Sequence, residues 1–448
     1  MTSIGAETPR HPIGERAVVV GAGMAGLLAA RVLADWYEHV TIVERDGLPA
    51  DVRNRGGVPQ GRHLHALLAR GQQLLEARFP GLTSELIDAG ATVGDVLADV
   101  RMHLNGHLLR PGPTGMVAIS ASRGFLEHHV RRRIIELSAI EVKDQCDVTG
   151  LVTTDDQRSI TGVRFVNRHH GGDPHVLTGD AVVDASGRTS RLPSWLAEIG
   201  VDAPAETRTD VGLSYASRPY RLDRERLGGA IAIIHGMTPD RPRTAAVAAF
   251  EAGTGMVTLG GIGEDRPPLD PEGFVEFART VSHDISEVVR SAEPLGDAIP
   301  FRFTASVRRH YERHRTLPDA LAALGDSFCS LNPIYAQGMT LAALSAESLD
   351  THLRRHGEIR PQLLHRQVAA AVNPAWRIVT GADIAFPTTP GRPNLPQRTL
   401  GRYINRLQAA AAHDATLAAA FMRVAGLVDG PTALLKPAVA RRVFTRAP

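Results

Sequence analysis

The feature that most constrains the fold is residues 16–46, which indicate a strand, a glycine-rich turn and a helix in succession. Residues 17–20 are a short run of apolar, mainly β-branched side chains, as is typical of a buried parallel strand. Gly21, Gly23 and Gly26 follow with the spacing GxGxxG. In such a motif the first glycine permits a tight turn, the second lets the backbone approach a pyrophosphate, and the third lets helix and strand pack closely. The stretch therefore predicts a dinucleotide-binding unit.

A second apolar run favours this interpretation over a purely structural glycine turn. Residues 40–43 predict another parallel strand, which delivers Glu44 to the position where an acid accepts hydrogen bonds from a ribose diol. The N-terminus of the intervening helix, with roughly +0.5 of an elementary charge, would face the phosphates. The motif by itself does not separate FAD from NAD.

Composition narrows the classes of protein that remain. The 448 residues are enough for two or three domain-sized cores, and a net charge of +2 gives no argument for a nucleic-acid partner. Cys146 and Cys329 form neither a disulfide framework nor a metal site of their own, which fits a reducing cytoplasm. Residues 1–15 lack the apolar core of a signal peptide and predict a disordered lead-in. No run reaches ~20 apolar residues, so we expect no integral membrane contact and a cytoplasmic protein.

The predicted elements indicate an α/β (α+β) fold, with a Rossmann-like nucleotide-binding domain, an inserted mixed-sheet substrate domain and C-terminal helices. A hairpin is predicted at 95–109, turning at Asn105 and Gly106, and strand-like runs recur between 201 and 300. The predicted boundaries are 16–90, 115–200 and 301–355 for the nucleotide-binding domain, 91–114 and 201–300 for the substrate domain, and 356–448 for the C-terminal helical region.

The segment after the second strand contains a long loop. Glycine, proline and charged residues mark it at 51–65, and long loops in compact domains are often functional. A helix is predicted to follow at 64–79. His63 and His65 lie two positions apart, which on a helix would point them to different faces, and no third candidate ligand accompanies them. We expect polar contacts near the dinucleotide here rather than a metal site.

Four motifs together resemble those of flavoprotein monooxygenases with the para-hydroxybenzoate-hydroxylase fold. They are GAGMAG at 21–26, an arginine that opens a helix at Arg123, DASGRTSR at 184–191 and GDSFCSLNPIYAQGM at 325–339. The segment VPQGRHLHALLARG at 58–71 and the pattern NPxYxQGM are most similar to the branch of bacterial polyether and polyene epoxidases related to squalene epoxidase. The resemblance extends from about Arg16 to the C-terminal helices. Ala336 departs from it, because this branch usually has glycine there; its methyl group would lie close to the isoalloxazine edge.

The resemblance implies a site for FAD, with each role carried onto a matching residue. Asp326 would accept a hydrogen bond from the ribityl chain, and Gly338 and Met339 would present backbone N–H groups to the flavin pyrimidine. The other residues implied to contact the cofactor are Arg45 and Arg123 near the phosphates or adenosine, Val148 by its backbone at the adenine, and Arg62 at the flavin or pyrophosphate. Asp184 is expected to hold the DASG turn.

The resemblance also implies the activity. Reduced FAD would react with O2 to give a C4a-hydroperoxide, which transfers one oxygen atom to a small lipophilic substrate, with alkene epoxidation of a polyene or terpenoid-type intermediate favoured. No catalytic side chain is assigned, because the flavin carries the chemistry. The electron source would be NAD(P)H or a separate flavin reductase. Alternatives are an aromatic hydroxylase, a flavin-dependent reductase or dehydrogenase, a halogenase (although its WxWxIP signature is absent), and a non-catalytic binding protein.

Overall fold

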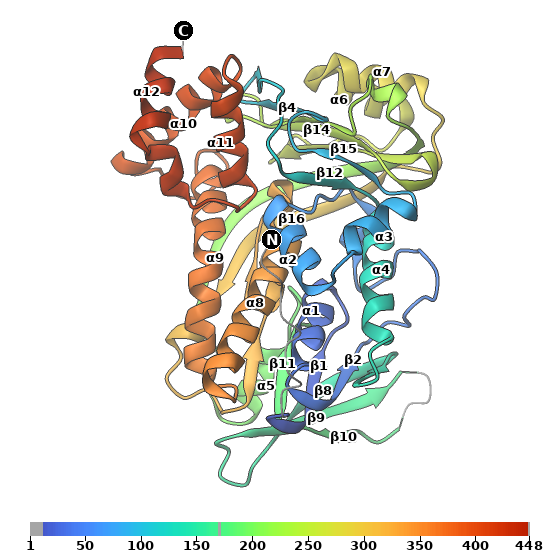
Figure 1. Cartoon of the computed structure of the whole chain (residues 1–448), viewed down its shortest axis with the longest axis vertical. Coiled ribbons are helices and arrows are strands. Elements are labelled where there is room, and N and C mark those ends of the chain that lie inside the picture. The colour runs from blue at the N-terminus through green and yellow to red at the C-terminus, as the bar shows by residue number, and fades with distance from the viewer. Residues whose placement is uncertain (1–11, 169–171, 447–448) are drawn as a thin grey trace, which may run out of the picture.

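The computed structural model of the protein describes residues 12–168 and 172–446, and its centre is a five-stranded parallel sheet (Figure 1). The strand order is β17-β11-β1-β2-β7. The strands are β1 (Gly14–Val20), β2 (Tyr37–Val43), β7 (Ile140–Lys143), β11 (Ala181–Asp184) and β17 (Leu321–Ala323). The predicted lead-in falls mostly on residues 1–11, outside the described residues. Its end at residue 15 is wrong, because Gly14 already pairs with Tyr37 of β2.

The parallel sheet is covered on both faces. Helices α1 (Met24–Leu33), α4 (Arg123–Ile135) and α8 (Gly338–His356) pack together, and α1 contacts both others. A second sheet of three strands, in the order β10-β9-β8, contacts β11, β1 and β2. Its strands are β8 (Cys146–Thr153), β9 (Ile160–Asn167) and β10 (His175–Thr178). This layering buries the largest apolar core of the protein, which includes residues 17–20 of β1 and most of the apolar side chains of α1.

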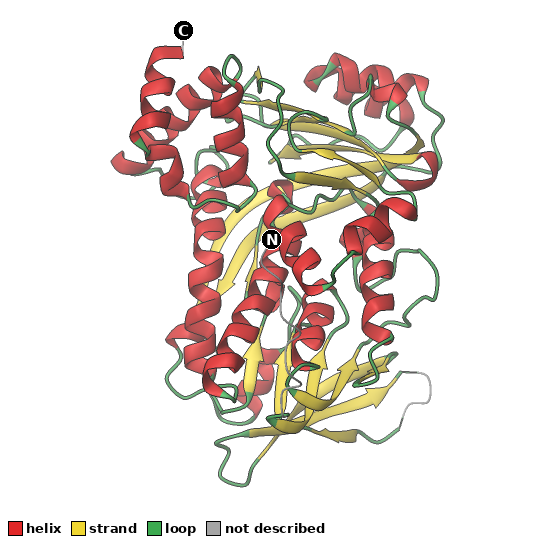
Figure 2. Cartoon of the chain, viewed as in Figure 1, coloured by secondary structure: helices red, strands yellow, loops and turns green. Residues whose placement is uncertain are grey.

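The upper half of the molecule is a mixed sheet of eight strands, which we call the large sheet (Figure 2). Its order is β18-β16-β12-β15-β14-β13-β4-β5. The strands are β4 (Val100–Leu104), β5 (His107–Leu108), β12 (Glu206–Arg221), β13 (Ala232–His235), β14 (Arg243–Ala249), β15 (Thr254–Ile262), β16 (Ile299–Arg309) and β18 (Cys329–Ser330). Helices α6 (Pro271–Val281) and α7 (His283–Ser291) pack against β14. The predicted boundary at residue 300 is too early, because β16 pairs with β12 as far as Arg309.

The predicted hairpin is present and joins the large sheet. Strands β4 and β5 pair antiparallel, and Asn105 and Gly106 between them both have positive φ angles, 50° and 80°. Positive φ at both central residues is the geometry that an Asn-Gly turn favours. A further pair, β3 (Thr92–Asp95) with β6 (Val117–Ser120), forms a separate two-stranded sheet. The mixed α/β fold class predicted from the sequence is confirmed.

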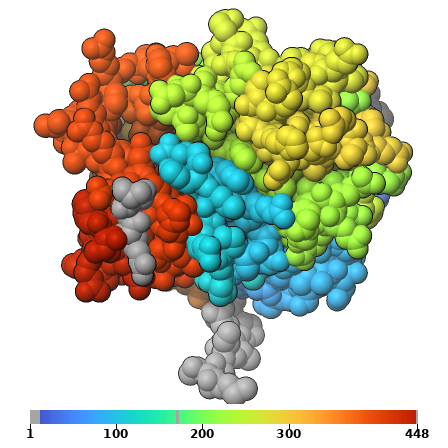
Figure 3. All heavy atoms as spheres, turned by 90° about the horizontal axis from the view of Figure 1, so that it is seen from above, coloured from blue at the N-terminus to red at the C-terminus, as the bar shows by residue number. Residues whose placement is uncertain are grey.

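From Gly338 onward the regular structure of the described chain is helical. Helix α9 (Pro361–Asp383) packs along α8, and α10 (Leu395–Ala411), α11 (Ala415–Ala425) and α12 (Pro437–Arg446) form a cluster in the upper left corner of Figure 1. Seen from above, the chain near residue 100 lies between this cluster and α6 with α7 (Figure 3). Leu97, Leu109 and Met116 pack into the helical cluster. None of the helices among the described residues is long and apolar enough to cross a membrane.

The helix predicted at 64–79 begins later than expected. Helix α2 spans Ala69–Arg78, and the residue before it, Leu68, is extended with φ −66° and ψ 156°. The reason is tertiary, since Leu64 donates its backbone N–H to Oγ1 of Thr258 in the large sheet at 3.3 Å. This docking holds the preceding residues in an extended conformation, and it overrides their apolar helical spacing.

Candidate functional site

The carboxyl ends of the central strands converge at one edge of the parallel sheet. Val20 of β1 is in register with both Val43 of β2 and Asp184 of β11, and Asp184 is in register with Ala323 of β17. The residues that follow these ends carry the predicted motifs. In open α/β sheets ligands bind at this edge, where successive connections leave to opposite sides. The parallel register therefore gathers motifs that are far apart in the sequence.

The three motif glycines have different physical reasons to be glycine. Gly21 has φ 99°, and a Cβ there would lie 2.7 Å from the carbonyl oxygen of Ala185. A Cβ on Gly26 would lie 1.8 Å from the carbonyl oxygen of Gly21. By contrast, a Cβ on Gly23 would meet no atom within 4 Å. Gly21 and Gly26 are thus required by the turn itself, whereas Gly23 faces open space at the N-terminus of α1.

Glu44 occupies the predicted place at the end of β2. Its buried carboxylate accepts hydrogen bonds from the backbone N–H of Ala22 at 2.6 Å and of Asp46 at 2.9 Å. These bonds fix the carboxylate beside the glycine turn. It is therefore oriented in advance for the contact with a ribose that the sequence predicted.

Arg55 is a residue of this site that the sequence analysis missed. Its guanidinium is buried and lies 2.7 Å from Glu127, 3.2 Å from Glu44 and 3.5 Å from Asp46, and it donates to the carbonyl oxygen of Ala22 at 2.8 Å. Burial lowers the pKa of this guanidinium, but the surrounding carboxylates outweigh burial and raise it. No local pattern marks Arg55 in its loop, because its partners come from three other segments.

Arg123 also lies in this network. It is the first residue of α4, as predicted, and it follows the N-cap Ser122. Its guanidinium is buried and lies 3.2 Å from Glu127. Glu127 therefore pairs with both Arg123, which the sequence analysis predicted near the phosphates or adenosine, and Arg55, which it missed.

Asp326 follows β17 at the same edge of the sheet. Burial raises the pKa of Asp326 to about 6, although Arg188, Arg123 and Arg309 act to lower it. The preceding Gly325 has φ 61° and lies against Ala25 in the first turn of α1. The GD motif and the GxGxxG motif are therefore in direct contact.

Asp184 performs the structural task that was expected of it. Its buried carboxylate accepts hydrogen bonds from the backbone N–H of Ser186 at 3.1 Å and from the hydroxyl of Ser190 at 2.5 Å. Burial raises the pKa of Asp184, and these hydrogen bonds oppose that effect. The side chain holds the DASG turn and is not directed at a ligand.

The N-terminus of α8 is the second helix end at the site. Its N-cap, Gln337, provides no side-chain hydrogen bond, and a Cβ on Gly338 would meet nothing within 4 Å. Met339 is buried beneath it. Ala336, where the related branch usually has glycine, adopts φ 54° and ψ 28°. That left-handed conformation is the one that glycine adopts without strain.

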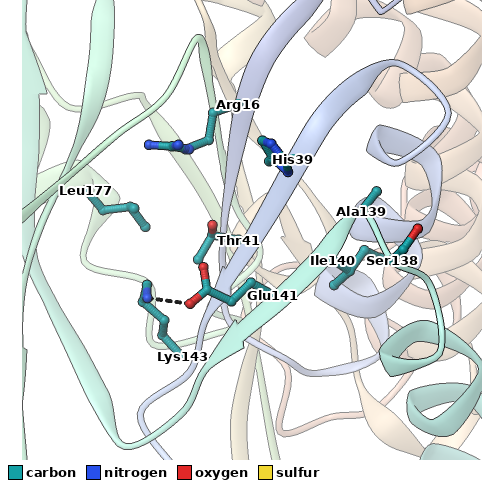
Figure 4. Close-up of a pocket in the computed structure, with 9 residues that line it drawn as sticks. All are labelled: Arg16, His39, Thr41, Ser138, Ala139, Ile140, Glu141, Lys143 and Leu177. Atoms are coloured by element: carbon teal, nitrogen blue, oxygen red, sulfur yellow. Dashed lines mark hydrogen bonds and ion pairs between the residues drawn. The ribbon is translucent and has the colours of Figure 1, made fainter.

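Three predicted contacts lie further from this centre. The Arg45 side chain is more than half exposed and lines a cavity of about 640 Å³ together with Arg53, Arg55 and Arg168. Val148 is buried in β8 opposite Phe165. Arg62 is exposed at the end of a short 3-10 helix, Pro59–Arg62. A second cavity, of about 380 Å³, lies between β1, β2 and β7 and Leu177 of β10 (Figure 4). None of the predicted cofactor contacts lines it.

An apolar cluster connects the large sheet to the loop before α8. Its members, which we call the aromatic cluster, are Val211, Leu213, Tyr215, Met237, Ile262, Phe301, Phe303, Ile334 and Phe386. Ile334 belongs to the NPIYAQGM segment, and Phe386 follows the end of α9. Buried Asp383, the last residue of α9, accepts hydrogen bonds from Asn332 at 2.9 Å and Tyr335 at 3.0 Å. The second oxygen of this carboxylate, Oδ2, has no partner among the described residues.

These features fit the cofactor that the sequence implied. Gly23 and Gly338 leave open space at two helix N-termini, neither of which has a side-chain cap. Such ends attract negative charge, and in FAD the matching groups would be the pyrophosphate and the flavin pyrimidine respectively. Glu44 and Asp326 lie on the same sheet edge and would accept hydrogen bonds from the ribose and the ribityl chain. These donors and acceptors are of the kinds that the phosphates, ribose, ribityl chain and pyrimidine of FAD require.

Solved structures share this fold. The flavin-dependent brominase Bmp2 matches with a TM-score of 0.66 and 17% identity, covering 96% of this chain and 98% of that one. The p-nitrophenol 4-monooxygenase PnpA from Pseudomonas putida DLL-E4 matches with a TM-score of 0.65 and 16% identity, covering 93% and 99%. The fold and the site define a flavoprotein of the FAD-dependent monooxygenase class, and the predicted enzyme class and FAD cofactor are confirmed.

Sequence comparison identifies the family. The chain belongs to the family of Protein Rv3254 of Mycobacterium tuberculosis (strain ATCC 25618 / H37Rv), to which it is 34% identical over 437 residues, 93% of this chain and 90% of the relative. It is 26% identical over 357 residues to the kynurenine 3-monooxygenase of Salinispora arenicola (strain CNS-205), 76% of this chain and 73% of that enzyme. No family model matches the chain.

Proposed function

We propose that this protein uses FAD to insert one oxygen atom from O2 into a small lipophilic substrate. The observation that carries the proposal is that Glu44, Asp326 and the uncapped N-terminus of α1 follow strand ends at one sheet edge, and that α8, whose N-terminus is also uncapped, packs against α1 and the turn that contains Asp326. The aromatic cluster of the large sheet connects to the loop before one of these helices. FAD, when bound and reduced, supplies the oxygen-transfer chemistry.

The residues of this chain would bind the flavin and the substrate and keep water away from them. The N–H groups of Gly338 and Met339 would stabilise the negative charge that develops on the flavin pyrimidine. The aromatic cluster would bind the substrate and exclude water, because water promotes side reactions that consume the oxidant before oxygen is transferred. In this arrangement the nucleotide-binding part holds the cofactor and the large sheet covers the substrate, in line with the domain division predicted from the sequence.

Within this class we favour epoxidation of an alkene, in a polyene or terpenoid-type molecule. The support is the motif set at 58–71 and 325–339 together with the apolar lining of the aromatic cluster. An electron-rich alkene needs no side chain to deprotonate it. The second candidate is hydroxylation of an aromatic ring, favoured by the names of two relatives, kynurenine 3-monooxygenase and 2,6-dihydroxypyridine 3-monooxygenase.

The first experiment is a visible absorption spectrum of the purified protein, followed by NADH or NADPH under air. We expect the bands of oxidised flavin, FAD released on denaturation, and bleaching by one of the nicotinamides or by an added flavin reductase. Candidate polyenes and prenylated aromatics are then added, and products heavier by one oxygen atom are sought by mass spectrometry. A protein that neither carries FAD nor takes it up would contradict the proposal.

A further inference from the structure

His63 lies where the long loop after β2 meets the large sheet. The side chain is buried, with 4% of its surface exposed. Its ring meets Tyr215 at 4.7 Å between centroids and Phe301 at 5.3 Å, both in edge-on arrangements. Both partners belong to the aromatic cluster. A polar ring is therefore inserted into the apolar surface that the proposed function assigns to the substrate.

Only one nitrogen of this ring has a hydrogen-bond partner in the described chain. Nδ1 lies 2.9 Å from the hydroxyl oxygen of Ser217, and that oxygen lies 2.6 Å from the hydroxyl oxygen of Thr258. Thr258 also accepts the backbone N–H of Leu64. No hydrogen bond links Nε2 to any residue in 12–168 or 172–446, and Nε2 is not among the fully enclosed unpartnered atoms of the described chain. Part of this atom therefore faces accessible space, and a ligand that covers it must offer an acceptor or leave the nitrogen without a partner.

The hydroxyl chain also determines which nitrogen carries the proton. Each hydroxyl has one proton to donate. Thr258 already accepts from Leu64, and within this chain its proton has one acceptor, the oxygen of Ser217. The proton of Ser217 then goes to Nδ1 of His63. This is the one direction that gives both hydroxyl protons an acceptor, and it leaves the ring proton on Nε2.

The ring is neutral at physiological pH. Burial, reinforced by the nearby positive charge of Arg62, lowers the pKa of His63 to about 4. A neutral imidazole with its proton on Nε2 is a hydrogen-bond donor at that atom. It would recognise an oxygen that accepts a hydrogen bond, and it would not select for an anion by charge.

We propose that Nε2–H of His63 donates a hydrogen bond to an oxygen atom of the substrate, which is therefore a lipophilic molecule bearing a hydroxyl or carbonyl group. This inference rests on the proposed function and defines its substrate class more closely. A hydrocarbon alkene would leave the donor unsatisfied within the aromatic cluster, which costs binding free energy. His63 is thus a specificity-determining contact, with Ser217 and Thr258 fixing its tautomer.

The test measures binding and does not depend on turnover. The full chain, loaded with FAD, is equilibrated by dialysis with two matched probe pairs, 2-naphthol with naphthalene and 4-phenylphenol with biphenyl. The variants are H63F, which keeps a ring without a donor, H63Q, which keeps a donor, and S217A, which releases the tautomer. H283F replaces a histidine whose side chain is 80% exposed, and it is the control. FAD content and far-UV circular dichroism report folding for each variant.

We expect the hydroxylated member of each pair to bind the wild type and H283F about tenfold more tightly, the usual effect of one such hydrogen bond. That preference should fall below threefold in H63F, weaken in S217A and persist in H63Q. If H63F does not fold, the preference for the hydroxylated probe is compared between S217A and H63Q. We expect it to be weaker in S217A than in H63Q.

Several outcomes overturn the inference. The inference is wrong if the wild type shows no preference for the hydroxylated probes, or if it binds none of the probes. It is also wrong if H63F retains the preference, or if S217A retains it where H63F does not fold. A retained preference is expected if Nε2–H serves only to contact an aromatic ring. A chain that does not bind FAD fails the proposed function instead, so the two failures are distinguishable.

Discussion

Ala25 and Gly325 touch across the site, because a Cβ on Gly325 would lie 2.5 Å from the Cβ of Ala25. Ala25 is in the first turn of α1, directly after the glycine turn, and Gly325 precedes Asp326. The glycine at 325 is therefore needed both for its φ of 61° and for close packing against α1. This contact sets the distance between the two motifs that are proposed to hold opposite ends of the ribityl and pyrophosphate chain.

Gly325→Ala should lower both stability and FAD binding. The added methyl group overlaps Ala25, and an alanine in the left-handed region costs roughly 1–2 kcal/mol in addition. We expect a loss of about 3 kcal/mol or more in the free energy of unfolding, measured by urea denaturation, and a lower FAD content. The matched test is the double variant A25G/G325A, which restores the space and should recover part of the loss. Equal losses in the single and double variants would contradict the role of the contact.

Ala336→Gly should stabilise the protein. Ala336 has φ 54°, so glycine would relieve backbone strain, and the greater freedom of glycine in the unfolded chain offsets part of that gain. We expect a net increase of about 0.5–1 kcal/mol in the free energy of unfolding. Ala320→Gly is the matched control, since Ala320 has φ 66° but lies outside the site. Both should stabilise, and only A336G should alter the visible flavin spectrum.

Arg55→Leu should be strongly destabilising. Its guanidinium is the buried counterion of Glu44 and is one of the cations around Glu127, so its removal leaves the charge of Glu44 without a buried cation and leaves Glu127 with Arg123 and Arg131. Breaking a buried pair in this way costs about 3–5 kcal/mol, so a large drop in urea midpoint and a loss of FAD binding are expected. Arg53→Leu is the control, because Arg53 is exposed and pairs only with exposed Asp51. A small effect of R55L, comparable with R53L, would argue against the network.

Asp326→Ala should sharply reduce FAD occupancy with a much smaller effect on folding. The carboxylate follows β17 at the site edge, where it is proposed to accept a hydrogen bond from the ribityl chain. Occupancy is measured as the ratio of flavin to protein absorbance after gel filtration with excess FAD. Asp297→Ala, at an exposed position, is the control. Full FAD retention in D326A with normal turnover would disprove this placement.

Asp383→Asn should change the pH dependence of stability. Burial raises the pKa of Asp383 to about 6, above the usual 3.8, so the folded state binds this proton more tightly than the unfolded state. The wild type therefore loses up to about 3 kcal/mol of stability, from this group, as pH rises from about 4 through 6. The amide that D383N introduces does not titrate and still accepts from Asn332 and Tyr335. Urea unfolding at pH 4.5 and 7.5 should show D383N gaining on the wild type at the higher pH; a constant difference would refute this.

The sequence alone was sufficient for the nucleotide-binding unit. The spacing of Gly21, Gly23 and Gly26, the apolar runs around them and the acid at Glu44 are local patterns, and local backbone preferences decide them. The Asn105–Gly106 turn and the helix that opens at Arg123 were predictable for the same reason. The fold class followed, because strands and helices that alternate in this way must bury their apolar faces against one another.

Tertiary structure decided what local patterns cannot contain. Arg55 belongs to the buried charge network because carboxylates from the segment after β2 and from α4 surround it, and no feature of its own loop indicates them. Helix α2 begins only at Ala69 because Thr258 of β15 and Ser217 of β12 form hydrogen bonds with Leu64 and His63, which precede the helix. The same contacts bury His63 beside the aromatic cluster, where it is proposed to act as a hydrogen-bond donor. In the sequence it is only one of several polar residues in a loop. Hydrogen bonds and charges of this kind depend on which segments meet in space, and only the folded chain brings them together.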